Sequence, residues 1–292
     1  MIPLLLLLLV CSGMALSLVR IVTQETEYMR ETIRLRQLET IVQSFMRTAL
    51  RQEDRTGITE TVYQTEPLFP GKEPVNIRVA VHRDHSVGLR FLQVTAEDSR
   101  KNEFALRQCR VDFPETLIQS VLRNSFALAG GAEQGGPEEE DGSVTSTSDG
   151  AVFPQFSAEE IAVWASTGFP TALELQRDGL SGWMYYSRDR VSLPKGLTVQ
   201  GSGIFLFADD AVFADNSVFT DRIIVLADRN LNIGSNVRLE KALLLCQGKL
   251  TVGTGSFING AVLARQPVNL GNQTVITVDR EVLEPFHSII SY

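Results

Sequence analysis

From Val191 onward the sequence repeats a unit of about nineteen residues, and each unit carries three short apolar clusters. In the stretch 222–241 these clusters are residues 223–226, Leu231 with Ile233, and Val237 with Leu239. The polar corners of successive units centre on Asp215, Gly234, Gly253 and Gly271, at a nearly constant spacing. Gly, Asn and Asp suit corners where the backbone turns left-handed. The pattern predicts a three-faced parallel β-helix of about four to five coils over residues 191–279.

The other end of the chain is apolar. Residues 1–19 contain no charged side chain, and as a helix they would be about 28 Å long, close to the hydrocarbon thickness of a bilayer. We therefore expect a transmembrane anchor at 1–19. A secretory signal peptide is the alternative, because Gly13 and Ala15 offer small residues at a cleavage site, although no basic residue precedes the apolar run.

The helical pattern continues beyond this segment, since no proline or glycine interrupts residues 20–56. Apolar residues recur at helical spacing, and they include Leu18, Ile21, Tyr28, Leu35, Val42 and Ala49. Glu25 and Glu39 fall on the heptad seam that these residues define, so we expect an amphipathic helix packed on a sheet rather than a coiled coil.

That sheet is predicted within residues 57–128. Three segments show the alternation of a strand, namely 75–83, 87–98 and 104–113, and residues 83–86 indicate a turn between the first two. A short helix with Pro114 near its first turn follows. The expected fold class is thus α+β, with a long N-terminal helix on a small antiparallel meander and a C-terminal β-helix.

A long, half-apolar N-terminal helix followed by an antiparallel meander resembles type IV pilins and pseudopilins. A related group of pilus-assembly proteins carries β-solenoid tails, to which residues 191–279 are similar. The resemblance implies an inner-membrane anchor and assembly into a pilus-like structure. That family has a basic leader ending in glycine and a glutamate at the fifth mature position, whereas this chain begins at Met1 and has Leu5.

Two regions complete the expected domain map. Residues 129–152 are rich in glycine, serine and acidic side chains and predict a flexible acidic linker. Residues 153–190 are expected to form a connector and solenoid cap, with a capping box at Ser157 and Glu160 and strands at 172–176 and 182–187. The last residues, 280–292, break the repeat and are expected to cap the final coil.

Candidate chemistry concentrates on the solenoid corners. Asp209 and Asp228 lie one predicted period apart and would stack, either as a carboxylate pair or as a calcium site, unless they serve only as turn residues. His82 and His85 are the only paired histidines, and strand geometry points them to opposite faces. We therefore expect no catalytic, cofactor-binding or metal-binding residue.

A disulfide between Cys109 and Cys246 is a further hypothesis. Trp164, Trp183, Tyr185 and Tyr186 could stack on a sugar, but core packing at the capped end is favoured.

With a net charge of −8, the chain is not expected to bind nucleic acid. The sequence favours a non-enzymatic, membrane-anchored structural subunit of a pilus-like, secretion or surface apparatus, with protein partners and with surface polysaccharide as a further candidate partner. Its body is expected in the periplasm or outside the cell, although the arginines Arg20, Arg30, Arg34 and Arg36 favour the cytoplasm. One alternative is a bactofilin-like protein that polymerises through its solenoid, and another is a carbohydrate-binding or carbohydrate-active β-helix.

Overall fold

The fold is described from a computed structural model of the chain. The structure describes residues 2–56, 60–65, 75–84, 86–97, 103–133, 153–165, 167–180, 184–284 and 286–291. The chain forms two compact units. The first comprises Met1–Ala80, Gln93–Leu106 and Ser291–Tyr292, and the second comprises Val81–Leu92 and Arg107–Ile290.

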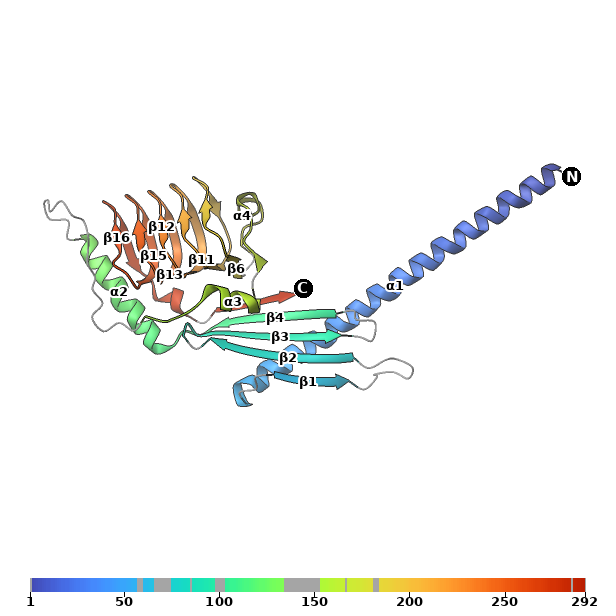
Figure 1. The fold of residues 1–292 in the computed structure, drawn as a ribbon, viewed down its shortest axis with the longest axis horizontal. Coiled ribbons are helices and arrows are strands. Elements are labelled where there is room, and N and C mark those ends of the chain that lie inside the picture. The colour runs from blue at the N-terminus through green and yellow to red at the C-terminus, as the bar shows by residue number, and fades with distance from the viewer. Residues whose placement is uncertain are drawn as a thin grey trace. The chain divides into compact units, whose positions relative to one another are not determined.

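The first unit is built on helix α1, Ile2–Thr56, which confirms the predicted long N-terminal helix (Figure 1). Leu38, Val42 and Met46 recur every four residues on one side of α1 and are buried. The ring of Phe45 lies 5.7 Å from that of Tyr63. The second half of the helix is therefore amphipathic, as its apolar spacing predicts.

An antiparallel meander follows α1 and confirms the three predicted strands, β2 (Val75–Asp84), β3 (Leu89–Glu97) and β4 (Glu103–Val111). Two strands that the sequence did not reveal lie at its edges, so that the order is β1-β2-β3-β4-β18, with β1 at Glu60–Thr65 and β18 at Phe286–Ser291. The predicted turn after β2 is confirmed, because the Asp84 carboxylate accepts hydrogen bonds from the backbone and hydroxyl of Ser86 at 2.8 and 2.5 Å.

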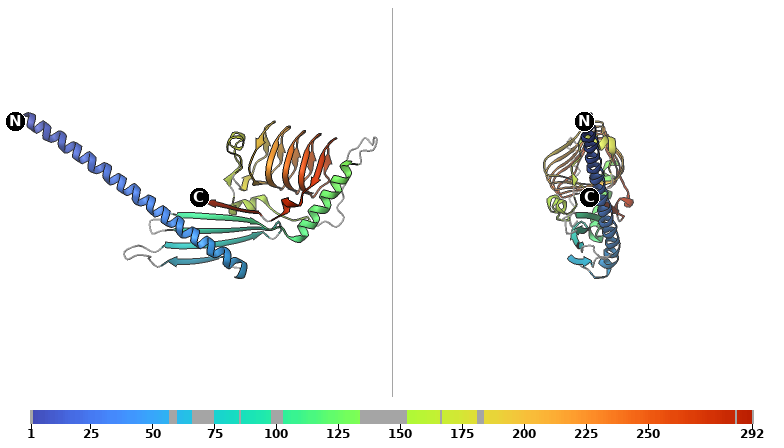
Figure 2. Two further views of the ribbon diagram at one scale, coloured as in Figure 1. Left: turned by 180° about the vertical axis from the view of Figure 1, so that it is seen from behind. Right: turned by 90° about the vertical axis from the view of Figure 1, so that its right-hand side faces the viewer.

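The second unit contains the solenoid, whose strands pair in parallel from coil to coil (Figure 2). A short face is formed by β7 (Val191–Leu193), β10 (Ala211–Phe213), β12 (Leu231–Ile233), β14 (Leu250–Val252) and β16 (Asn269–Leu270). The other strands are β5 (Thr167–Gly168), β6 (Met184–Ser187), β8 (Thr198–Val199), β9 (Gly203–Phe207), β11 (Val218–Ala227), β13 (Arg238–Cys246), β15 (Phe257–Ala264) and β17 (Val275–Val278).

Each long strand serves two faces of the solenoid. The register of β11 against β13 shifts between Phe219 and Arg222, and that of β13 against β15 shifts between Leu239 and Ala242. Such an irregularity bends the strand. With the short face, the two halves of the long strands make three faces, which confirms the predicted three-faced parallel β-helix. It has about five coils, where about four to five were expected. We call the half that follows the bend, with β9 and β6, the third face.

The coils shorten along the axis, which corrects the even spacing expected from the sequence. Val191, Ala211 and Leu231 are in register, so the first two steps are equal. The step from Leu231 to Leu250 is shorter by one position, and the step from Thr251 to Asn269 is shorter by one more. An alignment of the first coils with a constant period of about nineteen residues is therefore wrong by one position.

The left-handed corners also lie one or two residues after the predicted centres. At the corner that follows the short face, the residue with positive φ in successive coils is Gly196, Asn216, Asn236, Gly255 and Gln273. Asn tolerates this conformation better than most residues because its side chain can bond locally. Gly253 is needed for a different reason, since a Cβ atom there would lie 2.6 Å from the carbonyl carbon of Gly234 in the preceding coil.

The third face is buried on both sides. The rings of Phe205, Phe213 and Phe219 come from the three faces and meet with centroids 5.2 to 6.2 Å apart, so Phe205 points into the coil. Alternation then points Ile204 and Leu206 outward, yet they are 1% and 0% exposed. The next coils repeat this pattern, and therefore other parts of the chain cover the outer side of the third face.

Two helices of the second unit take part in this cover. Helix α2 (Glu115–Glu133) contacts β15 and β17, and α3 (Ala158–Ala165) contacts β6 and β9. Where β15 runs beyond its pairing with β17, the Ser125 hydroxyl accepts the Val262 N–H at 2.8 Å, and Asn124 donates to the Val262 carbonyl at 2.9 Å. Helix α2 thus replaces a strand at the C-terminal edge of the third face.

The opposite end of the solenoid is covered by α4, Ala172–Asp178, at the place of the strand predicted for 172–176. That prediction is wrong, because Thr171 and Glu174 form a reciprocal capping box that starts a helix. Leu175 of α4 is fully buried, and the Phe169 ring lies 5.5 and 5.4 Å from those of Phe205 and Phe207. The strand predicted at 182–187 is confirmed as β6 over its described residues, 184–187, and α3 confirms the helix predicted after Ser157.

Residues 280–292 were expected to cap the final coil. Their first part forms a 3₁₀ helix, η1 (Arg280–Leu283), that contacts β13 and β15 and buries Val282 and Leu283, whereas Phe286–Ser291 form β18 beside β4 and so do not cap the coil. Helix α2 extends to Glu133, so it includes the beginning of the expected linker at 129–152, and residues 134–152 lie outside the described residues. Cys109 and Cys246 are buried and free, so the hypothesis of a disulfide between them is wrong.

Within the part of the chain that the structure describes, no helix is both long and apolar enough to cross a membrane. The predicted anchor at 1–19 has a helical backbone from Ile2. The side chains of residues 1–16 and 18 lie outside the described residues.

Candidate functional site

The corner carboxylates that the sequence singled out do not form a pair in register. Ala227 pairs with Phe207, and this register sets Arg229, rather than Asp228, beside Asp209. Arg229 Nη1 lies 3.3 Å from Asp209 Oδ1. The expected stacking of Asp209 on Asp228 is therefore wrong, because the constant period taken from the sequence is one position too short in this coil.

Asp228 holds the start of helix α3. Its two carboxylate oxygens accept the Ala158 N–H at 3.1 and 2.9 Å, and Oδ1 also accepts from Gln247 Nε2 at 3.2 Å. Burial raises the pKa of Asp228 above its ordinary value, and the hydrogen bonds from Ala158 and Gln247 offset this only in part. Gln247 also donates to the Phe156 carbonyl, which ties the segment before α3 to the solenoid.

The other aspartates of these coils bond the neighbouring coils. Asp210 Oδ1 accepts from the backbone and side-chain N–H groups of Asn230 at 3.2 and 3.0 Å. Asp215 Oδ1 accepts the Ser235 N–H at 2.8 Å, and Asp221 Oδ2 accepts the Gly201 N–H at 2.7 Å. Within the described residues, no three side chains of His, Cys, Asp or Glu are grouped as a metal site would need. These carboxylates therefore have structural roles.

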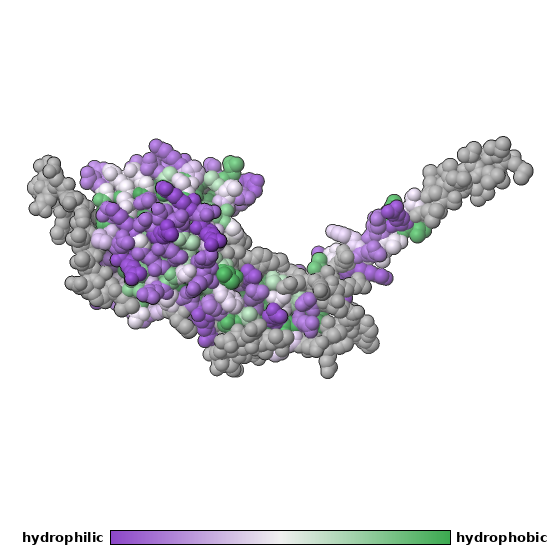
Figure 3. Space-filling model, in the orientation of Figure 1, coloured by the Kyte–Doolittle hydropathy of each residue, from purple (hydrophilic) through white to green (hydrophobic). Residues whose placement is uncertain are grey.

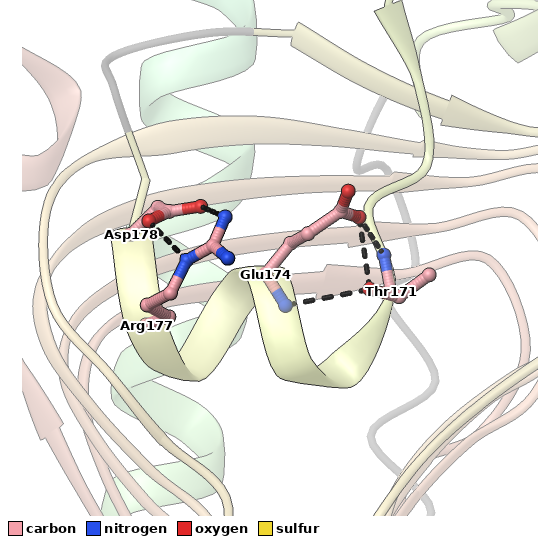
Figure 4. A network of polar contacts seen from close by, with 4 residues as sticks. All are labelled: Thr171, Glu174, Arg177 and Asp178. Atoms are coloured by element: carbon pink, nitrogen blue, oxygen red, sulfur yellow. Dashed lines mark hydrogen bonds and ion pairs between the residues drawn. The ribbon is translucent and has the colours of Figure 1, made fainter.

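A second group of polar side chains lies on α4 (Figure 4). Glu174 accepts hydrogen bonds from the Thr171 N–H and hydroxyl at 2.7 and 2.9 Å, and these bonds lower the pKa of Glu174. Arg177 donates to both oxygens of Asp178, at 2.8 and 2.7 Å, and lowers the pKa of that carboxyl. The four side chains are exposed, and the two residues of each pair lie within three positions of each other in the sequence. These contacts therefore stabilise α4 itself.

One cavity of about 530 Å³ lies beside His82 and Trp164, whose rings stack at 4.5 Å with an interplanar angle of 2°. Its lining also includes Arg83, Asp84, Ser86, Gln155, Glu160, Ile161 and Val163. His85 and Trp183 lie outside the described residues. Tyr185 is buried against Phe205 at 6.0 Å, which confirms core packing for this member of the predicted aromatic set.

An exposed apolar surface occupies α1 between residues 19 and 35. Val19, Val22, Met29 and Ile33 are 64, 58, 64 and 57% exposed, and Ile21, Tyr28 and Leu35 are also exposed. Every described side chain from residue 19 to residue 30 is exposed to solvent. The side of the solenoid seen in Figure 3 is mainly hydrophilic, whereas polar and apolar residues alternate on this part of α1. Large apolar side chains that gather on an exposed helix are typical of interaction surfaces.

We compared the chain with known protein families, curated proteins and solved structures, and none of them matches it.

The cover of the third face was not predicted, although its signal is present in the sequence. Residues 203–207, 223–227 and 242–246 are apolar throughout and lack the alternation of the short face. A continuous apolar run indicates a strand buried on both sides. The solenoid therefore offers fewer free surfaces than a separate β-helix would.

Proposed function

We propose that the chain is a non-enzymatic structural subunit of a pilus-like, secretion or surface apparatus, anchored in a membrane through residues 1–19 and assembled through α1. The exposed apolar surface of α1 carries the proposal. A helix segment without tertiary contacts is marginally stable in water, and its apolar side chains need a partner.

The solenoid fits the part of a rigid module of fixed length. Phe169 and Leu175 cover its first coil, while α2 bonds the free edge of β15 through Ser125 and Asn124. Edges of the third face that are covered in this way cannot pair with another chain. This favours the pilus-like subunit over the bactofilin-like alternative, in which solenoids join end to end.

The corner carboxylates support a non-enzymatic role. Asp209 forms an ion pair with Arg229, and Asp228 is engaged by Ala158 and Gln247. A general acid or base needs a carboxyl group that can reach the substrate's proton. Here these groups bond the chain to itself.

Cell fractionation tests the proposed location. The full chain is expected in the membrane fraction, resistant to extraction by high salt and released by detergent, whereas a variant that lacks residues 2–19 is expected in the soluble fraction. A reporter fused after Tyr292 is expected to be active on the side of the membrane that faces away from the cytoplasm. Recovery of the full chain in the soluble fraction, or a reporter active only in the cytoplasm, would contradict the proposal.

Binding of surface polysaccharide is a second candidate function, favoured by the cavity beside Trp164. Aromatic rings stack on sugars, and Gln155 and Glu160 supply hydrogen-bonding groups in the same lining. Titration of the full chain with polysaccharide fragments should change tryptophan fluorescence, and Trp164→Ala should abolish the change. A response that persists in Trp164→Ala would place the binding elsewhere.

A further inference from the structure

The exposed apolar residues of α1 fall into two sets on different sides of the helix. Successive residues turn by about 100°, so Ile21, Tyr28 and Leu35 lie in line with the stripe of Leu38, Val42 and Met46 that is buried in the first unit. The second set lies elsewhere on the helix. We define it as the seam, with residues Val19, Val22, Thr26, Met29 and Ile33.

The seam has the spacing of a coiled-coil interface. Its residues alternate at intervals of three and four, which assigns Val19, Thr26 and Ile33 to a positions and Val22 and Met29 to d positions of a heptad. The same register continues toward the N-terminus in the sequence, at Leu5, Leu8, Ser12 and Ala15. The a residues Val19, Thr26 and Ile33 are β-branched, as a residues of two-stranded coiled coils commonly are, while the d positions carry Val22 and Met29 in place of the usual Leu.

Thr26 is the one polar residue of the seam, and its hydroxyl is already satisfied. Its Oγ1 donates to the Val22 carbonyl at 2.6 Å within the same helix. A Thr that bonds back to the preceding turn has no need of a partner across an interface. Thr26 is therefore compatible with burial in an apolar interface.

The charges beside the seam identify a second copy of the chain as its partner. Glu25 falls at a g position and Arg30 at the next e position, and both side chains are exposed. In a parallel two-stranded coiled coil, g residues of one helix form salt bridges with e residues of the other. Glu25 of each copy would then meet Arg30 of the other, twice in the pair. An antiparallel arrangement loses this match.

We infer that the chain self-associates as a parallel dimer through the seam, Val19, Val22, Thr26, Met29 and Ile33. The heptad considered in the sequence analysis runs through Ile21, Tyr28 and Leu35. These residues lie on a different side of α1, in line with the residues that are buried in the first unit. The inference rests on α1 alone, and it would stand if the proposed membrane location failed.

Cysteine cross-linking of the purified full chain in detergent micelles tests the dimer. Every variant carries Cys11→Ser, while Cys109 and Cys246 are buried and burial raises the pKa of both thiols. Met29→Cys and Val22→Cys place a thiol on the seam. Gln24→Cys is the matched control, because residue 24 is also exposed and lies at the f position, opposite the seam.

Under mild oxidation, Met29→Cys and Val22→Cys should each form a disulfide-linked dimer at least about tenfold faster than Gln24→Cys, because a dimer raises the effective thiol concentration into the millimolar range. Equal rates at the three positions, or no cross-linked dimer, would overturn the inference. A mixture of Val22→Cys and Ile33→Cys chains that cross-links to each other faster than Met29→Cys does to itself would show antiparallel pairing and would also overturn it.

Discussion

Truncation of Leu243 tests whether the outer side of the third face is covered. Val225 pairs with the inward-pointing Phe205 on one side and with Leu244 on the other, so Leu244 also points inward. Because side chains alternate along a strand, the preceding residue, Leu243, points outward. Its side chain is nevertheless 0% exposed. Leu243→Ala removes three carbon atoms at about 0.8 kcal/mol each and leaves a cavity, and we expect a loss of about 3 kcal/mol in the free energy of unfolding.

Urea unfolding of the full chain, followed by circular dichroism, measures this loss. Thr251→Ala is the control, since Thr251 is outward-facing but only half-buried on the short face, and the expected cost is less than about 1 kcal/mol. If the outer side of the third face were open to solvent, Leu243→Ala would cost no more than the control. That result would refute the covered third face.

Three further predictions concern single contacts. Asn216→Gly should leave the free energy of unfolding nearly unchanged and Asn216→Val should lower it by about 1–2 kcal/mol, because φ is +59° at this corner; equal values from urea unfolding would contradict this. Ser125→Ala leaves the buried Val262 N–H without its acceptor and should cost about 1–3 kcal/mol, with faster hydrogen exchange at that amide; unchanged protection would show that Ser125 is dispensable. Burial raises the pKa of Asp228 in the folded protein, so the folded state holds this proton more tightly than the unfolded chain does. The wild type should therefore lose stability relative to Asp228→Asn as the pH rises from about 4 through the folded pKa, as followed by urea unfolding at several pH values; a change in the opposite direction would contradict the pKa shift.

The repeat and the long helix could be predicted from the sequence because each produces a periodic pattern over many residues. Corner residues recur from coil to coil, and no proline or glycine interrupts residues 20–56. The exact register was harder to predict, since the later coils are shorter than the first ones. A difference of one position places Arg229, and not Asp228, beside Asp209, and this removes the candidate carboxylate pair.

Helix α4, the role of α2 and the seam on α1 were not predicted, each for a different reason. The spacing of Thr171 and Glu174 is a capping box, yet the apolar residues of 172–176 suggested a strand. The role of α2 could not be predicted, because Ser125 and Val262 are separated by 137 residues and no periodicity connects them. The seam on α1 was obscured by a second apolar stripe on the same helix, and only the burial of Leu38, Val42 and Met46 separates the two.

The solution mass of the full chain tests the central claim that α1, and not the solenoid, is the assembly element. Light scattering in detergent, corrected for bound detergent, is expected to give twice the 32.3 kDa mass of one chain. The double variant Val22→Asp, Met29→Asp places charges on the seam and is expected to be a monomer with unchanged helix and strand content. An assembly whose mass does not change in this variant would contradict the account and place self-association on another surface.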